Sequence, residues 1–257
     1  MKPRLGAWHR LVIVLGVAFF LMPLVVTGAF SLWEGGDRYG FAAYRELVGD
    51  PALWSSLLLS LQLAGETMLL GLVLLVPAMI FVHLKAPWLK PLFEFASALP
   101  FVVPAIALVA GLTTLYTGPV WLIGTANYLV VPYFFLALPY AYRAIDVGMT
   151  NLDMHTLTEA GQSLGASWAQ IFRHVLLPNL STALIGATLL TLTIVMGEFT
   201  FASVLLFKTF AVYINDTGSS KVTEAAALSL VSFLITWAAM LGVLLTGRGN
   251  AQIGGAR

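Results

Sequence analysis

Long stretches of apolar sequence without charge constrain this chain more than any other feature. A helix that crosses the hydrocarbon core of a bilayer needs about 20 mostly apolar residues. Six stretches meet this requirement: Leu11–Leu32, Leu57–Val82, Phe95–Tyr116, Val120–Tyr142, Leu180–Phe207 and Ala225–Thr246. We therefore predict an all-α polytopic membrane protein with six transmembrane helices, organised as one domain over residues 1–257. The first helix would occupy residues 11–32 and the core of the domain residues 57–246.

The composition agrees with a bilayer as solvent and excludes several kinds of site. Charged residues make up 10% of the chain, against about 25% in a soluble domain. The net charge of +1 gives no broad basic field, so we expect no nucleic-acid partner. There are no cysteines, and His9, His83, His155 and His174 lie too far apart for a paired-ligand motif. We predict no metal site and no cofactor bound to this chain.

The first apolar stretch follows Lys2, Arg4 and Arg10, as the apolar segment of a signal peptide would. Such a segment is about 7–15 residues long. This stretch is longer, and no clean Ala-x-Ala site follows it. We predict an uncleaved first helix.

The distribution of Lys and Arg over the loops predicts the orientation. Placing the N-terminus inside puts nine of these residues on the cytoplasmic side and four outside. Because cytoplasmic loops carry the excess of positive charge, we predict that both termini are cytoplasmic. The loop from Trp33 to Trp54 is then external, and the long loop from Arg143 to Pro178 is cytoplasmic.

The cytoplasmic loop carries signals for two short helices joined by a sharp turn. Thr156 and Glu159 have the spacing of a capping box, which predicts a helix over Leu157–Leu164. Gly165 follows where a left-handed residue is favoured. Ser167 to Gln170 is a second capping box, and we expect the helix that it opens to end before Pro178.

The second of these helices presents apolar residues with a helical period, and they need a covering surface. They are Trp168, Ile171, Phe172 and Val175. A docking site for a soluble partner and a packed connector between two spans both explain this pattern. A DNA-binding helix-turn-helix is disfavoured, because the loop is tethered to spans at both ends and has few basic residues.

The same loop contains a long spaced motif: Glu159, Ala160, Gly161, Gly165, Val175, Leu177 and Pro178. It resembles the cytoplasmic motif of binding-protein-dependent ABC importer permeases, which reads Glu-Ala-Ala, three residues, Gly, nine residues, Ile, one residue, Leu-Pro. The departures are Gly161 for alanine and Val175 for isoleucine, both conservative. Weaker resemblances lie at Tyr44–Leu47, Pro100–Pro104 and Gly197–Phe199, the last similar to permeases for polyamines, ferric iron or thiamine.

The resemblance implies a MetI-like permease fold in a bacterial inner membrane. Its coupling loop would span residues 146–178 and contact an ATPase through the motif residues and Phe172. It also implies a second permease chain, which we expect to differ from this one, two ATP-binding subunits that hold Mg-ATP, and an external binding protein. No phosphate-binding loop is present in this chain, so we expect no enzyme activity of its own.

Two acidic residues, Glu66 and Glu198, lie within predicted spans. A charge at mid-bilayer costs at least roughly 2.5 kcal/mol on insertion scales. Both could line the solute pathway and favour a cation, which would place polyamine ahead of ferric iron, thiamine or an aminophosphonate. The alternatives are a structural hydrogen bond or a side chain that reaches the interface.

Two other classes of membrane protein remain as alternatives. An ion-driven secondary transporter would normally show inverted repeats, and none is evident. An intramembrane serine protease needs a base within the spans, yet the four histidines map to the predicted cytoplasmic side.

Overall fold

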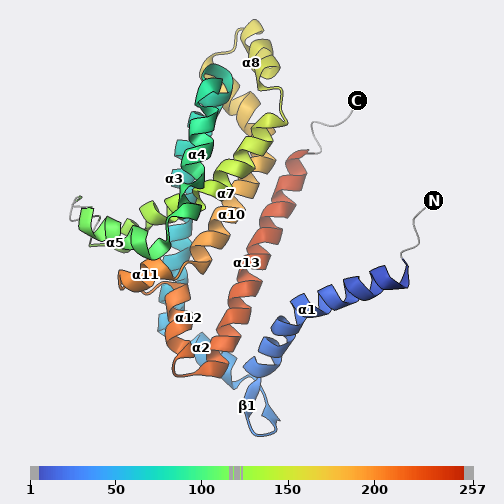
Figure 1. Cartoon of the computed structure of the whole chain (residues 1–257), viewed down its shortest axis with the longest axis vertical. Coiled ribbons are helices and arrows are strands. Elements are labelled where there is room, and N and C mark those ends of the chain that lie inside the picture. Colours follow the sequence, from blue (N-terminus) through green and yellow to red (C-terminus); the bar gives the residue numbers. More distant parts are fainter. Residues whose placement is uncertain (1–5, 116–117, 119–121, 123, 252–257) are drawn as a thin grey trace. The chain divides into compact units, whose positions relative to one another are not determined.

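The computed structural model describes residues 6–115, 118, 122 and 124–251, and these form helices almost throughout (Figure 1). Their contacts divide the chain into two compact units, Met1–Ser55 with Tyr213–Ile235, and Ser56–Val212 with Thr236–Arg257. The all-α prediction is confirmed. The single-domain organisation stays a prediction.

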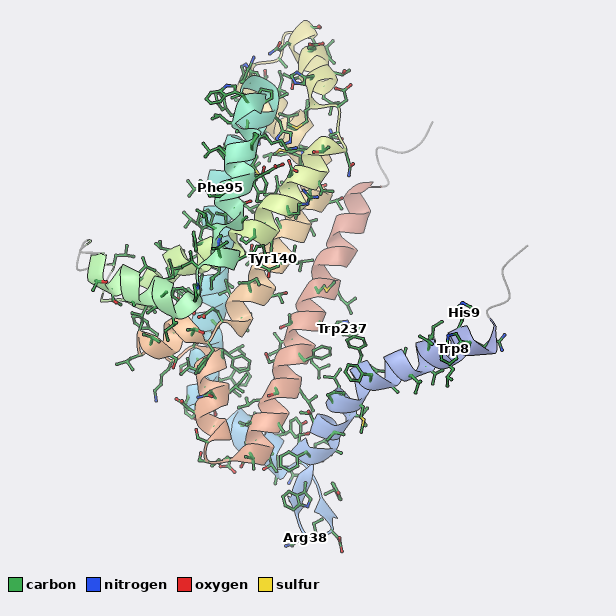
Figure 2. All side chains as sticks on the ribbon, viewed as in Figure 1. Trp8, His9, Arg38, Phe95, Tyr140 and Trp237 are labelled. Atoms are coloured by element: carbon green, nitrogen blue, oxygen red, sulfur yellow. The ribbon has the colours of Figure 1, made fainter. Side chains whose placement is uncertain are left out.

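The first unit begins with α1 (Ala7–Ser31), which carries Trp8 and His9 near its start (Figure 2). A hairpin follows, in which β1 (Trp33–Gly35) pairs antiparallel with β2 (Arg38–Tyr39). Gly35 and Gly36 make its turn at φ values of +100° and +57°, which a side chain would strain. Helix α2 (Ala42–Gly49) comes next.

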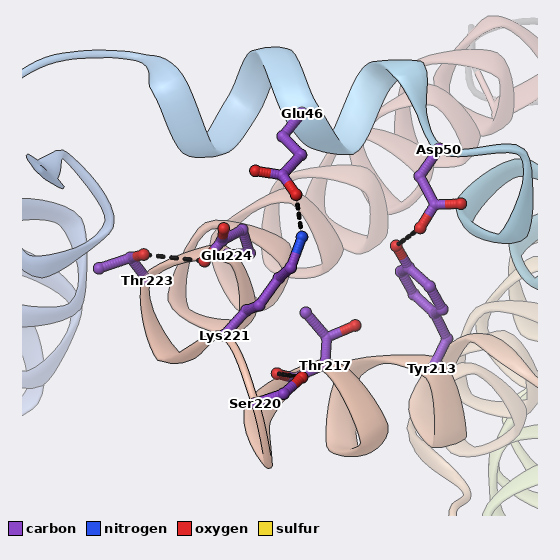
Figure 3. Close-up of polar contacts among 8 residues, drawn as sticks. All are labelled: Glu46, Asp50, Tyr213, Thr217, Ser220, Lys221, Thr223 and Glu224. Carbon is purple, nitrogen blue, oxygen red and sulfur yellow. Dashed lines mark hydrogen bonds and ion pairs between the residues drawn. The ribbon is translucent and has the colours of Figure 1, made fainter.

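Polar contacts join α2 and its end to the second segment of this unit (Figure 3). The Tyr213 hydroxyl donates to Asp50 Oδ2 over 2.6 Å. Lys221 forms an ion pair with Glu46. Tyr213 lies on α12 (Phe210–Gly218), and Lys221 precedes α13 (Val222–Ala251).

The second unit is built on α4 (Lys90–Val102), α7 (Val130–Thr150) and α10 (Leu177–Gly197), with most of α3 (Pro51–Lys85) (Figure 1). Short 3₁₀ turns, η1 (Pro87–Leu89) and η2 (Ala126–Leu129), precede α4 and α7. Helices α7 and α10 pack very closely at Gly148 of α7. A Cβ atom at this position would lie 2.2 Å from the Ala183 Cβ of α10, so only glycine permits this approach. Phe95 and Tyr140 mark α4 and α7 in Figure 2.

The predicted third span, Phe95–Tyr116, is wrong as one continuous helix. Helix α4 ends at Val102, and α5 (Ala105–Leu115) leaves at a bend of 100°. Pro104 explains the break, since it has no N–H and pushes the preceding residue out of the helical region. Val103 is accordingly extended, with φ −91° and ψ 117°.

The other predicted spans correspond to helices whose ends differ from the predicted ones. Helix α3 is longer than Leu57–Val82 at both ends. The predicted span Val120–Tyr142 begins partly outside the described residues, and α7 continues to Thr150. Within the described residues, four helices are long and apolar enough to cross a membrane, or five if the bent pair is one span. The count of six stays a prediction.

Candidate functional site

The first helix of the predicted cytoplasmic loop, α8 (Met154–Ser163), starts three residues earlier than the predicted start at Leu157. Asp153 is the N-cap, and its carboxylate accepts from the Thr156 backbone N–H over 3.1 Å and from the Thr156 hydroxyl over 2.7 Å. These bonds lower the pKa of Asp153. The prediction that Thr156 caps the helix with Glu159 is therefore wrong, because a stronger acceptor takes that role.

The turn after α8 has the backbone bonds of a Schellman motif. The Ala166 N–H donates to the Gly161 carbonyl over 3.0 Å, and the Gly165 N–H donates to the Gln162 carbonyl over 2.8 Å. Gly165 has φ +77°, which confirms the predicted left-handed conformation. A Cβ atom at Gly165 would meet nothing within 4 Å, so backbone strain alone requires glycine here.

The second capping box is confirmed, because Ser167 and Gln170 each bond the backbone N–H of the other. The helix that it opens, α9 (Trp168–Ile171), does not end before Pro178 as predicted. It passes through a π-helical segment, η3 (Phe172–Leu176), straight into α10. The π segment lies directly before Pro178, whose missing N–H interrupts the regular hydrogen-bond pattern of a helix.

One face of the helix pair is buried against the other helices of the second unit. Met154, Ile171 and Leu176 belong to a core cluster that includes residues of α3, α7 and α10. Gly161 faces Ile171, and a Cβ there would lie 2.9 Å from Ile171 Cγ1. This contact explains why glycine stands where the related motif has alanine.

The predicted site residues fall into two groups. Phe172, Val175 and Leu177 are half-buried and pack against the core cluster. Glu159, Ala160, Gly165 and Pro178 are exposed, whereas Gly161 is buried between the two helices. The pair thus has an inner face that holds it and an outer edge that is free to bind.

Leu164, at the tip of the turn, is a candidate contact that the sequence analysis missed. Its side chain is 88% exposed, which is unusual for a leucine in an ordered turn. Its only sequence signal was its place before Gly165. We define the outer edge of the helix pair as Glu159, Ala160, Leu164 and Gly165.

A buried carboxylate on α7 was also missed. Asp146 Oδ1 lies 3.0 Å from Lys90 Nζ of α4 and 3.2 Å from His83 Nε2 of α3, and Arg143 lies at 3.9 Å from Oδ2. The His83 Nδ1 faces the Met79 carbonyl at 2.9 Å. Both ring nitrogens of His83 therefore face oxygen atoms. The cluster joins α3, α4 and α7, and two of these helices, α3 and α7, also supply buried residues to the core under the helix pair.

The structure gives the two intramembrane glutamates different partners. Glu198 follows α10, and its carboxylate accepts from the Phe201 N–H, with both oxygens at 3.1 Å. It thereby satisfies a backbone N–H in the first turn of α11 (Thr200–Val204). The helix is interrupted at Glu198 and Phe199, but Trp168–Val204 is still one candidate span by length and composition, and it covers most of the predicted span Leu180–Phe207. Glu66 accepts from the Gln62 amide over 2.8 Å within α3.

Residues 68–248 match the model of one protein family, described as binding-protein-dependent transport system inner membrane component. The chain belongs to this family. It is 28% identical to a putative 2-aminoethylphosphonate transport system permease protein, PhnV, of Salmonella paratyphi A, over 89% of each chain. It is 27% identical to a probable sulfate transport system permease protein, cysT, of Chlorokybus atmophyticus, over 73% of this permease and 68% of that one.

Solved structures share the fold of this permease. A chain of a bacterial ABC transporter involved in import of the acidic polysaccharide alginate matches with a TM-score of 0.63 and 16% identity, over 94% of this chain and 95% of that chain. A chain of an amino acid ABC transporter, solved with histidines, matches with a TM-score of 0.55 and 16% identity, over 81% and 97%. The MetI-like permease fold is confirmed.

Family membership settles the general function. The chain is a permease subunit of an ABC importer, a membrane component that works with ATPase and binding-protein partners. It is a transport component and not an enzyme, as predicted. This decides against the ion-driven carrier and the intramembrane protease.

Proposed function

We propose that this permease forms half of the translocation pathway of an importer with two different permease chains and two ATPase subunits, and that the outer edge of its helix pair docks on one ATPase. The observation that carries the proposal is an exposed, ordered edge held by a buried inner face. Both termini and this edge would be cytoplasmic, as the Lys and Arg distribution predicts.

Coupling requires that a push on the outer edge reaches the membrane helices. The Schellman turn and the second capping box fix the backbone of the pair. Ile171 is fully buried, and it touches the core cluster that joins α3, α7 and α10. In addition, α9 continues into α10 without a break. A rigid path therefore runs from Leu164 to the fifth predicted span.

Leu164→Asp tests the docking surface without disturbing the fold, because the side chain is 88% exposed. We expect ATPase binding to weaken by about tenfold, the effect of losing an interface contact of ~1.4 kcal/mol. Val48→Asp is the matched control, because Val48 is 65% exposed within the loop Trp33–Trp54, which the sequence predicts to be external. The amount of ATPase that copurifies with the permease measures both variants.

Gly165→Arg should weaken the same binding further, because it adds backbone strain and bulk at the edge. Glu159→Ala should have a milder effect. Ligand binding by the external protein should not change. Normal ATPase binding and normal transport in both Leu164→Asp and Gly165→Arg would contradict the proposal.

We propose a small charged solute as substrate, with an aminophosphonate ahead of a polyamine. The argument for a cation depended largely on Glu198, and that carboxylate already accepts from the Phe201 N–H. The similarity to a 2-aminoethylphosphonate permease over 89% of each chain favours the aminophosphonate. Calorimetry on the external binding protein of the same system tests this directly. Tight binding of spermidine with none of 2-aminoethylphosphonate would reverse the order.

A further inference from the structure

An open groove lies between the end of α3 and the start of the second helix of the pair. Its volume is about 320 Å³, and its walls are almost entirely apolar. Pro77, Ile80, Phe81 and Leu84 form one wall, and Phe172 contributes to the other. Lys85 and Trp168 line the same groove, and the Lys85 Nζ lies 5.5 Å from the centre of the Trp168 ring.

The groove has a polar end and an apolar end. Lys85 is the last residue of α3 and follows the predicted second span. Pro77 lies about 12 Å further into that span, at a helical rise of about 1.5 Å per residue. Trp and Lys are the residues that sit at the headgroup level of a bilayer, with apolar side chains toward the acyl chains. The groove therefore follows the polarity of a lipid molecule.

The charges at the polar end favour an anion. Among the described residues, no acidic side chain forms an ion pair with Lys85, whereas the neighbouring Lys90 is held by Asp146. Basic pockets between helices on the cytoplasmic side of membrane proteins bind anionic headgroups. A soluble ATPase cannot follow the groove as far as Pro77, because that end lies within an apolar span.

We propose that this groove binds one anionic phospholipid, with the phosphate at Lys85 and an acyl chain along Phe81 toward Pro77. Trp168 and Phe172 belong to the helix pair, so the lipid would support the side of the pair that faces α3. The lipid site depends on insertion in a membrane and not on ATPase docking. Its test can therefore fail while the proposed coupling function stands, and the reverse.

The experiment measures lipid retention by the whole transporter, purified from membranes and incubated with phosphatidylglycerol or phosphatidylcholine. Native mass spectrometry counts the bound lipids. We expect wild type to retain phosphatidylglycerol in preference to phosphatidylcholine. Lys85→Ala should bind phosphatidylglycerol about fivefold more weakly, the effect of one basic residue near an anionic headgroup. Lys85→Arg should keep most of the binding.

Arg173→Gln is the matched control, because Arg173 is an exposed basic residue of η3 that does not line the groove. It should retain phosphatidylglycerol as wild type does. Equal retention by wild type and Lys85→Ala would overturn the proposal, and so would equal retention of phosphatidylcholine and phosphatidylglycerol by wild type. A photoreactive side chain at position 81 gives a second measurement: an adduct with lipid supports the site, and an adduct with the ATPase overturns it.

Discussion

The base of the helix pair formed by α8 and α9 and the outer segments of the first unit hold charge in opposite ways. Under the pair, Asp146 is a buried carboxylate with partners from three helices, and its side chain is 5% exposed. In the first unit, Glu46 and Lys221 pair with side chains that are 55% and 49% exposed. Water therefore screens the Glu46–Lys221 pair more than it screens the contacts of Asp146.

The difference suggests what each region is built to do. Removing one partner from a buried charge cluster leaves the others uncompensated, which is strongly destabilising. An exposed pair contributes about 0–1 kcal/mol and can open at little cost. A region that transmits force needs the first arrangement, whereas the Glu46–Lys221 contact of the first unit holds its segments together only weakly.

Asp146→Ala should lower the free energy of unfolding the most, by about 3–5 kcal/mol, because it leaves His83 and Lys90 without their shared carboxylate. Glu46→Ala is the control and should cost about 0–1 kcal/mol. The midpoint of thermal unfolding of the purified transporter in detergent compares the two. Similar losses of stability in both variants would break the comparison of the two regions.

Gly148→Ala should have the next largest effect and lower the free energy of unfolding by about 1–3 kcal/mol, because it overpacks the contact between two helices. The added Cβ would lie 2.2 Å from the Ala183 Cβ and would force α7 and α10 apart. Gly186→Ala on α10 is the matched control, since its Cβ would meet nothing within 4 Å. Because alanine favours a helix over glycine by about 1 kcal/mol, the control should be neutral or stabilising. Equal melting temperatures for the two variants would contradict the close packing.

Mutation can distinguish the observed cap of α8, Asp153, from the predicted cap, Thr156. Asp153→Ala should increase fraying of the first turn of α8, because it removes the acceptor for the Thr156 N–H. Thr156→Ala should increase it less, since the backbone bond to Asp153 remains. Hydrogen exchange at the Thr156 and Leu157 amides measures the fraying of the helix. A larger effect from Thr156→Ala would restore the predicted cap.

Local signals in the sequence were sufficient for part of the site. Gly165 and Ser167 were predicted correctly because a left-handed turn and a capping box each depend on a few adjacent residues. The cap of α8 was predicted at Thr156, and only the side-chain geometry of the structure shows that Asp153 takes this role. The two closest partners of Asp146, His83 and Lys90, come from α3 and α4, so no local pattern could bring them to α7.

The same limit applies to the spans. Apolar length predicted helices at the right places, but the bend of 100° between α4 and α5 depends on packing and was not predicted. Glu198 was predicted to lie within a helix, because nothing in its neighbours showed that a short new helix begins at Thr200. Its carboxylate caps that helix, one of the roles that the sequence had left open.

Tyr213→Phe should have the smallest effect on the stability of the fold, and the pH dependence of this effect identifies the contact with Asp50 as its cause. The Tyr213 hydroxyl donates to Asp50 and lowers the pKa of Asp50 below its usual 3.8. Burial, and then this bond, raise the pKa of Tyr213 to about 12. Because folding lowers the pKa of Asp50, the ionised carboxylate stabilises the fold at pH values above its usual pKa. This stabilisation is lost as the pH falls through the lowered pKa of the folded protein. Because folding raises the pKa of Tyr213, the protonated hydroxyl stabilises the fold below about pH 10. This stabilisation is lost as the pH rises through about 12.

The difference in stability between wild type and Tyr213→Phe should therefore be constant from about pH 5 to pH 9. Because both groups are partly exposed, we expect it to be about 0.5 kcal/mol. It should shrink below about pH 4, where protonated Asp50 no longer strengthens the bond. Thermal unfolding of both proteins across this range measures it, with Tyr39→Phe as the control, because Tyr39 is 67% exposed on the hairpin of the same unit. A difference as large as that for Asp146→Ala would show that the first unit also depends on a charged contact, and the two regions would no longer differ.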